Sequence, residues 1–234
     1  MYKDITLSAS LMCFDWLNAG EQLKQIEEAG VDLLHIDVVD GKFAPDFTMG
    51  SSIINVFREK TKLPSDYHFM VEEPSRLFGS YDITPGDTYT IHQECSRNLH
   101  RDLVSIRQMG AKVGLALSPA TQLNVLEYVI EELDTILIMT VNPGYKAQQL
   151  VPQMFTKIRD LKEMILNKGL KTNIMVDGNV NQQNIPEMVG SGADILVLGS
   201  SSLFRKDSTI CDSMDLIKNS IDQGVIRRKE VLGI

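Results

Sequence analysis

Cysteine is scarce in this chain. Its 234 residues include three cysteines, Cys13, Cys95 and Cys211, and no two of them have the CxxC spacing. An odd and widely spaced set argues against a disulfide framework and against a thiolate zinc cluster, because both need paired cysteines. The start of the sequence also lacks the charged-then-apolar layout of a secretion signal. We therefore expect a reducing compartment and a cytoplasmic location.

The chain also lacks an excess of positive charge and a long apolar run. Lys and Arg number 23 against 31 Asp and Glu, which gives a formal net charge of −8. Nucleic acids and anionic membranes are bound mainly through basic surfaces, so we expect neither as a partner. No apolar run approaches the roughly 20 residues of a membrane span. A small anionic substrate stays compatible with this composition, because a few local groups can hold it.

No Ser/Pro-rich linker and no low-complexity tract divides the sequence, so we expect a single domain over residues 1–234. Short apolar or β-branched runs alternate with segments of helical period from end to end. The expected strands are Ile5–Ser10, Val31–Val39, Asp66–Val71, Thr88–His92, Lys112–Leu117, Thr135–Val141, Asn173–Val176 and Ile195–Leu198. Several of these runs are apolar throughout, which is typical of parallel strands covered on both faces.

Three of the intervening stretches repeat apolar residues at helical steps, namely residues 17–29, 151–167 and 209–222. Gly30, Gly110 and Gly192 each follow a helical stretch, where a helix stop is expected. The polar segment Phe78–Asp87 is so short that we expect only a vestigial helix there. Eight strands with intervening helices predict an α/β fold, a (β/α)₈ TIM barrel, with a doubly wound open sheet as the alternative.

Polar side chains interrupt the apolar strands near their carboxyl ends. His35 and Asp37 are two residues apart and therefore point to the same side of the second strand. His68 lies near the end of the third strand and Asp177 at the end of the seventh. Barrel active sites assemble at this end, and buried polar groups need partners, which a divalent cation would supply. This nitrogen and oxygen set suits zinc, iron(II), manganese or cobalt better than calcium, unless the four are unrelated residues at loop entrances.

Glycines stand near the ends of the last three expected strands. Gly144, Gly178 and Gly199 follow the sixth, seventh and eighth strands, respectively. Glycine lets backbone N–H groups approach an anion closely, and barrels often hold phosphate at the loops after strands seven and eight, with a short helix behind them. Residues 201–204 could begin such a helix. The joint placement favours a phosphate site, although each glycine taken alone is typical of a turn.

Several motifs follow one another in order along the chain. They are Ser8-Ala-Ser10-Leu, His35-x-Asp37-x-x-Asp40-Gly41-x-Phe43-x-Pro45, His68-x-Met70, His92-x-Glu94, Val141-Asn-Pro-Gly144, Val176-Asp177-Gly178 and Gly199-Ser200-Ser201. This ordered set, from about residue 5 to residue 221, resembles the ribulose-phosphate 3-epimerases. The run from Ser10 to Cys13 is somewhat similar to close relatives, the D-allulose-6-phosphate 3-epimerases.

The resemblance implies a metal-dependent ketose-phosphate 3-epimerase. Its preferred reaction would convert D-ribulose 5-phosphate to D-xylulose 5-phosphate by proton transfer at C3, through a metal-stabilised enediolate. His35, Asp37, His68 and Asp177 match the family's ligands for one divalent ion, for which zinc is expected first and iron, manganese or cobalt next. Asp37 and Asp177 also match its acid/base pair. The resemblance further implies a small-molecule sugar phosphate as the partner and assembly into a homo-oligomer.

Further residues are expected to bind the substrate, through its reacting carbons or its phosphate. They are Ser10, Met70 and Met139, whose roles the resemblance implies, and Gly144, Lys146, Gly178, Asn179, Gly199 and Ser200. Lys146 would supply a direct charge to the phosphate, unless it is a solvated loop residue. His92 and Glu94, at the end of the fourth strand, either orient a metal ligand or satisfy each other.

The chain departs from the family pattern at a few positions. Val39 stands where the family usually has Met, and Asp46 where it has Asn. Gly144-Tyr145-Lys146-Ala147 replaces Gly-aromatic-Gly-Gly, and Gly178-Asn179 replaces Gly-Gly. The phosphate end is thus rewritten, which leaves D-allulose 6-phosphate as an alternative substrate and a catalytically silent sugar-phosphate-binding barrel as an alternative of another class. The second strand has no interior Lys, which argues against related phosphate-binding decarboxylases and aldolases.

Overall fold

Eight parallel strands close into a barrel in the computed structural model of the chain, which describes residues 4–48, 50–144 and 148–234. The strands are β1 (Thr6–Ser10), β2 (Leu33–Val39), β3 (Ser65–Met70), β4 (Thr88–His92), β5 (Lys112–Leu117), β6 (Thr135–Met139), β7 (Asn173–Asp177) and β8 (Ile195–Leu198). β1 pairs with β8 from Thr6 with Ile195 to Ala9 with Leu198. This pairing closes the sheet, so the predicted (β/α)₈ barrel is confirmed and the open-sheet alternative is wrong.

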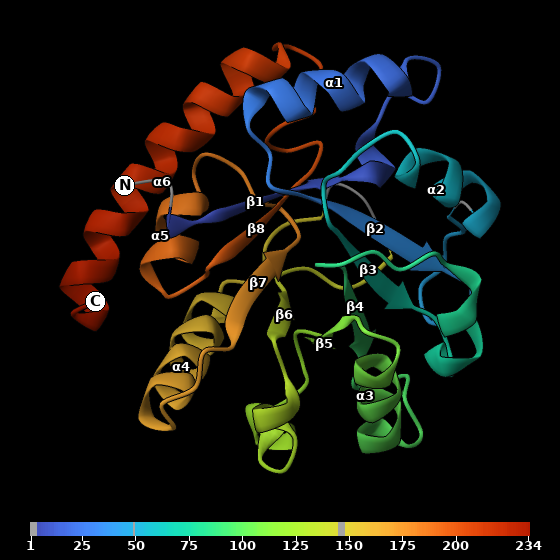
Figure 1. The fold of residues 1–234 in the computed structure, drawn as a ribbon. Coiled ribbons are helices and arrows are strands. Elements are labelled where there is room, and N and C mark those ends of the chain that lie inside the picture. Colours follow the sequence, from blue (N-terminus) through green and yellow to red (C-terminus); the bar gives the residue numbers. More distant parts are fainter. Residues whose placement is uncertain (1–3, 49, 145–147) are drawn as a thin grey trace.

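Helices surround the strands on the outside of the barrel (Figure 1). They are α1 (Ala19–Ala29), α2 (Ser51–Arg58), α3 (Leu99–Gln108), α4 (Gln153–Asn167), α5 (Ile185–Gly190) and α6 (Ile210–Leu232). The connection after β3 contains a 3₁₀ helix, Pro74–Ser80, instead of a full α-helix, as its short polar sequence predicts. Gly30, Gly110 and Gly192 have φ values of 85°, 87° and 117°, which confirms that each ends a helical stretch in the left-handed region.

The end of the chain differs from the prediction in two places. α6 continues to Leu232, well past residue 222, and Gly224 lets it approach α5 closely: a Cβ at Gly224 would lie 2.6 Å from Val189 Cβ. The short helix expected at residues 201–204 is wrong. The N–H groups of Ser202, Leu203 and Phe204 all donate to the Gly199 carbonyl, which makes one tight turn, and no helix propagates from it before α6 begins.

The interior of the barrel is apolar on one half and polar on the other. The strands β5 to β8 contribute a buried apolar cluster, Ala116, Leu137, Met139, Met175, Ile195 and Val197. The strands β1 to β4 contribute instead the buried polar residues Ser8, Ser10, His35, Asp37, Asp66, His68, Thr90 and His92. The strand register pairs Asp37 with His68 and His68 with Thr90, so these polar side chains lie next to one another. Three of the four side chains singled out at the strand ends, His35, Asp37 and His68, lie on this polar half, and Asp177 faces them from β7.

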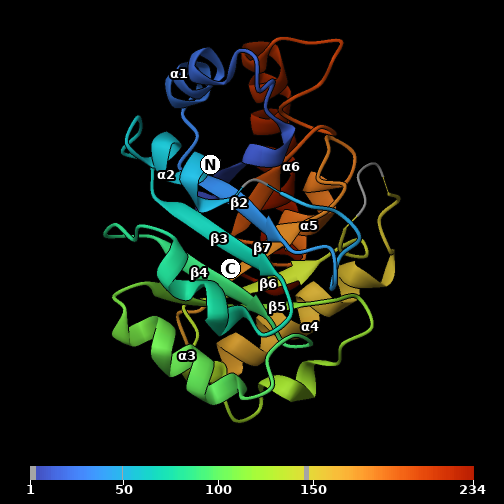
Figure 2. The same ribbon diagram turned by 90° about the vertical axis from the view of Figure 1, so that its right-hand side faces the viewer.

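Two loops meet at the carboxyl end of the barrel. Figure 2 shows the strands from the side, with the loops after β2 and β6 beyond the same ends of the strands. Gly144 of the second loop packs against Ala44 and Pro45 of the first: an added Cβ would lie 2.9 Å from Ala44 Cβ and 2.7 Å from Pro45 Cδ. Since Gly144 also has a φ of 103°, this close approach requires glycine. Among the described residues, no helix is long and apolar enough to cross a membrane.

Candidate metal and active site

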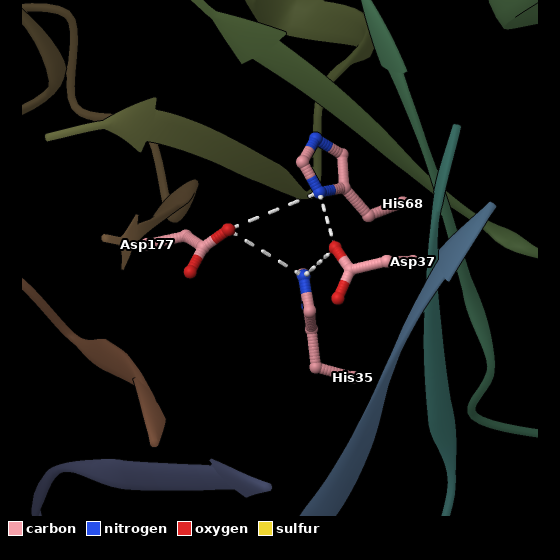
Figure 3. Close-up of side chains that lie close together, drawn as sticks. All are labelled: His35, Asp37, His68 and Asp177. Atoms are coloured by element: carbon pink, nitrogen blue, oxygen red, sulfur yellow. Dashed lines mark hydrogen bonds and ion pairs between the residues drawn. The ribbon is translucent and has the colours of Figure 1, made fainter. Parts of the chain in front are cut away.

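Four polar side chains converge at the carboxyl end of the barrel (Figure 3). His35 and Asp37 come from β2, His68 from β3 and Asp177 from the end of β7, and their ligand atoms all lie within 4.8 Å of one another. His35 Nε2 and His68 Nδ1 each lie 3.2 Å from Asp37 Oδ1. They lie 3.8 and 4.0 Å, respectively, from Asp177 Oδ2. The structure thus brings together the four residues that the strand-end pattern singled out.

Burial and mutual charge push the two carboxyl groups toward opposite protonation states. Burial alone would raise the pKa of Asp37, but His35 and His68 outweigh it and hold that pKa well below its usual range. Burial, together with the Asp37 charge, raises the pKa of Asp177. Burial tends to lower the pKa of His35, but the nearby Asp37 carboxylate outweighs burial and raises this pKa. For His68, burial prevails and lowers the pKa. The pKa values of the two carboxyl groups are therefore displaced in opposite directions, as suits an acid and base pair.

The second ring nitrogen of each histidine also faces a polar group. His35 Nδ1 lies 2.9 Å from Asp66 Oδ2. His68 Nε2 lies 2.8 Å from His92 Nε2, and His92 Nδ1 lies 3.1 Å from Glu94 Oε2. His92 therefore contacts both Glu94 and a candidate metal ligand. Asp66 was missed by the sequence reasoning, although its position two residues before His68 places both side chains on one face of β3.

A cavity of about 150 Å³ opens beside the four residues. Its lining includes every predicted substrate-binding residue that the structure describes, namely Ser10, Met70, Met139, Gly144, Gly178, Asn179, Gly199 and Ser200. Lys146 lies outside the described residues. Ser10 Oγ is 3.4 Å from Asp37 Oδ2, and Val39 and Asp46, two departures from the family pattern, also line the cavity.

The lining also includes Gln148, which the sequence did not indicate, and Val141, which the sequence indicated only as part of the motif that ends at Gly144. Both follow β6, and their place in the wall depends on the path of the loop after that strand, which no local pattern predicts. Gly178 at the end of β7 packs on Val141, where an added Cβ would lie 2.5 Å from Val141 Cγ2. This side of the cavity is therefore formed by contacts between two loops.

Residues of the loops after β7 and β8, among them Gly178, Asn179, Gly199 and Ser200, line the cavity. Gly178 has a φ of 109° and Asn179 a φ of 47°. The Asn179 side chain donates to the Gln148 carbonyl at 2.9 Å, so it ties its loop to the loop after β6. Among the residues that the structure describes, no acceptor takes the backbone N–H groups of Gly178, Asn179, Gly199 or Ser200. Such unpaired N–H groups on successive residues can hold an anion.

Solved structures share the fold at low sequence identity. The 3-hexulose-6-phosphate synthase from Salmonella typhimurium superimposes with a TM-score of 0.63 at 16% identity and covers 94% of this chain and 100% of that one. The thiamine phosphate pyrophosphorylase from Pyrococcus furiosus gives a TM-score of 0.60 at 12% identity, over 95% of this chain and 98% of that one. At these identities the likeness shows the barrel alone.

Curated sequences are much more similar. A profile of the Ribulose-phosphate 3 epimerase family matches residues 6–204. The ribulose-phosphate 3-epimerase of Bacillus subtilis (strain 168) is 37% identical over 87% of this chain and 94% of its own length. The enzyme of the same name from Synechocystis sp. is 39% identical over 86% of this chain and 88% of its own length. The chain belongs to the ribulose-phosphate 3 epimerase family and is an enzyme of the isomerase class.

Proposed function

We propose that this enzyme interconverts D-ribulose 5-phosphate and D-xylulose 5-phosphate by inverting C3. The observation that carries the proposal is the pairing of Asp37 and Asp177, which reach the same point from β2 and β7 with their pKa values displaced in opposite directions. Inversion at a carbon next to a carbonyl requires removal of a proton on one face and its return on the other, so it needs two such groups. The names of the curated relatives support the pentulose phosphate as the substrate.

Asp37 and Asp177 are the proton carriers in this proposal. In one direction Asp37, which is held ionised, accepts the C3 proton, and protonated Asp177 donates to the opposite face of the planar enediolate. Their roles exchange in the reverse reaction. The apolar side chains of Met70 and Met139 line the cavity beside them and restrict water at the reacting carbon. Ser10, close to Asp37, is placed to donate a hydrogen bond to a substrate oxygen.

His35, Asp37, His68 and Asp177 are proposed to hold one divalent ion. The fit is supported by the chemistry of the donor set, because two imidazole nitrogens and two carboxylate oxygens within 4.8 Å of one another form a mixed set typical of zinc, iron, manganese and cobalt sites. When bound, such a cation supplies positive charge that stabilises the oxygen anion of an enediolate. We propose zinc as the first candidate, with iron, manganese or cobalt as alternatives.

The phosphate is proposed to bind at the loops after β7 and β8. The proposal rests on Gly178, Asn179, Gly199 and Ser200, which line the cavity and whose backbone N–H groups have no acceptor within the described part of the chain. Backbone N–H groups hold a phosphate dianion without adding basic side chains, in keeping with the acidic composition. Gly144 borders the same cavity from the loop after β6 and completes the proposed substrate-binding set.

One coupled assay tests the proposal. The purified enzyme is loaded with zinc and given D-ribulose 5-phosphate or D-allulose 6-phosphate, and formation of the C3 epimer is followed. We expect the pentulose phosphate to be turned over with the higher kcat/KM. Faster turnover of the hexulose phosphate would select the D-allulose-6-phosphate activity. No turnover of either, with both bound, would select the silent sugar-phosphate-binding barrel.

Assembly and location stay proposals as well. Large apolar side chains are exposed in the described structure, including Leu17 at 95% and Phe47 at 77%, which supports assembly into a homo-oligomer. Light scattering on the protein as it elutes from a size-exclusion column measures its mass directly, and the mass of a monomer would contradict assembly into a homo-oligomer. We keep a cytoplasmic location as the expectation from the cysteine pattern.

A further inference from the structure

The two candidate histidine ligands use different ring nitrogens. His35 turns Nε2 toward Asp37, and His68 turns Nδ1 toward the same carboxylate oxygen. A neutral imidazole carries one proton, so it can bind a cation only through the nitrogen that lacks it. Something must therefore hold the proton on the far nitrogen of each ring, Nδ1 in His35 and Nε2 in His68. The structure places a different carboxylate behind each ring.

Asp66 stands behind His35. Its Oδ1 accepts a hydrogen bond from the Thr90 hydroxyl, and its Oδ2 lies 2.9 Å from His35 Nδ1. Within the described residues, neither His35 Nδ1 nor Asp66 Oδ2 makes a hydrogen bond of regular geometry, and each has the other as its ion-pair contact. An ionised carboxylate only accepts, so the facing nitrogen is the one that keeps the proton. His35 Nε2 is then left bare toward the centre of the site.

Room for this arrangement is built into the neighbouring strands. Asp66 and Thr90 are both fully buried. Gly114 on β5 is the register partner of Thr90, and a Cβ there would lie 2.9 Å from both Thr90 Cα and Thr90 Cβ. Real Cβ atoms do not approach so closely, so glycine at this position is what admits the Thr90 side chain into the barrel. The contact of Asp66 with His35 is therefore supported from a third strand.

Glu94 lies behind His68, with His92 between them. Its Oε1 accepts from the Ser118 N–H at 2.9 Å and from the Thr121 hydroxyl, and its Oε2 faces His92 Nδ1. A carboxylate held by two donors is an acceptor for His92, so Nδ1 of that ring carries the proton and Nε2 is bare. His68 Nε2 must then donate to His92 Nε2, 2.8 Å away, and His68 Nδ1 is left bare toward Asp37.

The Glu94 anchor is itself held from outside the barrel. Lys157 on α4 is largely buried, and its Nζ donates to the Ser118 carbonyl at 2.8 Å. This contact fixes the loop whose Ser118 N–H holds Glu94. The ring of Phe43, from the loop after β2, covers His92 at a centroid distance of 4.6 Å. The relay from Glu94 to His68 is thus restrained at Glu94 and at His92.

We propose that Asp66 and Glu94 are positioning residues of the metal site, Asp66 acting directly on His35 and Glu94 acting through His92 on His68. Each fixes the ring orientation and the tautomer that leave the inward nitrogen free for a cation. Partners of this kind usually change metal affinity by 10–100-fold when removed. The inference rests on the proposed function, because it assumes that the four-residue group holds a divalent ion.

The test measures metal affinity, separately from turnover. The whole enzyme and the variants Asp66→Asn and Glu94→Gln are titrated with zinc in competition with a chromophoric chelator, and cobalt(II) absorption reports the coordination. We expect both variants to bind zinc about 10–100-fold more weakly while the far-ultraviolet circular dichroism stays unchanged. The matched control is the variant Asp102→Asn. Asp102 is another buried carboxylate, on α3, and it accepts a hydrogen bond from Ser96 Oγ at 2.7 Å. The zinc affinity of this variant should equal that of the unsubstituted enzyme.

A double-mutant cycle separates positioning from general stabilisation. In a His92→Phe background, which keeps an aromatic ring against Phe43, Glu94→Gln should change zinc affinity less than about twofold, because its route to His68 is gone. Full retention of the Glu94 effect in that background, or unchanged zinc affinity in both single variants, overturns the proposal while leaving the proposed function intact. Failure of the unsubstituted enzyme to bind any divalent ion overturns the metal part of the proposed function and this inference with it.

Discussion

Replacement of Asp177 by asparagine separates proton removal from inversion. If Asp37 and Asp177 serve opposite faces of the substrate, Asp177→Asn leaves the group on one face in place. One of the two epimers should then still lose its C3 proton to Asp37 and regain one from the same side. The variant should therefore exchange that proton with solvent without forming the other epimer. A mechanism with one carboxylate serving both faces predicts that exchange and inversion fall together.

The expected size of the effect follows from the contacts of Asp177. Its carboxylate makes only long contacts in the described structure, 3.8 Å to His35 and 4.0 Å to His68, and its side chain is 21% exposed. An amide of the same shape should therefore leave the barrel folded. Loss of an acid or base group lowers the rate by roughly 10²–10⁴-fold, or about 2.7–5.4 kcal/mol of barrier. We expect inversion to fall at least a hundredfold, and exchange on one epimer to fall much less.

The assay runs in deuterium oxide with each pentulose phosphate separately. Proton NMR follows the C3 signal, and a coupled assay follows the epimer. Both are run with saturating zinc, and bound metal is measured, because Asp177 is also a candidate ligand. Asp37→Asn provides the mirror experiment and should retain exchange with the other epimer. Near-normal inversion by the Asp177 variant would remove this residue from the mechanism, and equal loss of exchange from both epimers would refute the two-face reasoning.

Three further predictions follow from other parts of the structure. Removal of the metal by a chelator should abolish turnover without unfolding the barrel, and zinc, manganese or cobalt should restore it; full activity in metal-free protein would contradict the site. Gly144→Ala should lower the free energy of unfolding by about 1–3 kcal/mol in urea titrations and should raise KM. The reason is that the residue has a φ of 103° and that an added Cβ would lie 2.7 Å from Pro45 Cδ. An unchanged free energy of unfolding and an unchanged KM would contradict the contact between the two loops. Burial tends to raise the pKa of Glu94, but the hydrogen bonds that Glu94 accepts from His92 and its other donors outweigh burial and lower this pKa from 4.5 to about 2. The ionised carboxylate therefore stabilises the fold above pH 4.5, and this stabilisation should be lost as the pH falls through about 2. Glu94→Gln should flatten the curve of stability against pH in that window, and identical curves would contradict the assignment.

The strands could be predicted because parallel strands are covered on both faces and so are apolar almost throughout. The errors lie at their ends, where contacts outside the strand decide. The second strand begins at Leu33 and not at Val31, since the Val31 N–H still donates to Ile26 of the preceding helix. The sixth ends at Met139 because Thr140 turns its N–H and hydroxyl to the Asp177 carbonyl. Neither contact has a signal in the local sequence.

The residues of the site also fall into those that the sequence could predict and those that it could not. His35 and Asp37 could be placed together because alternation along one strand fixes their common side, and His68 and Asp177 because parallel strands end at the same mouth. Asp66 obeys the same alternation, but it lies deeper in its strand than the ends where active sites are sought. The conformation of the phosphate loops could not be predicted. It depends on contacts such as that between Asn179 and Gln148, which are 31 residues apart.

The substitution Asn179→Gly tests what this departure from the family pattern does. Glycine accepts the φ of 47° without cost, whereas a residue with a side chain loses up to about 1–2 kcal/mol in the left-handed region, least of all asparagine. The change also removes the hydrogen bonds from Asn179 to the Gln148 carbonyl and from Asn181 to the Asn179 side chain, each contributing about 1 kcal/mol. The two lost hydrogen bonds outweigh the small backbone gain, so the melting temperature should fall by a few degrees without preventing folding. The tether between the loops after β6 and β7 is lost, however, so KM for the sugar phosphate should rise several-fold while kcat stays within about twofold. An unchanged KM would mean that the tether does not shape the phosphate end of the cavity, and a matching fall in kcat would mean that it acts on the carboxylates instead.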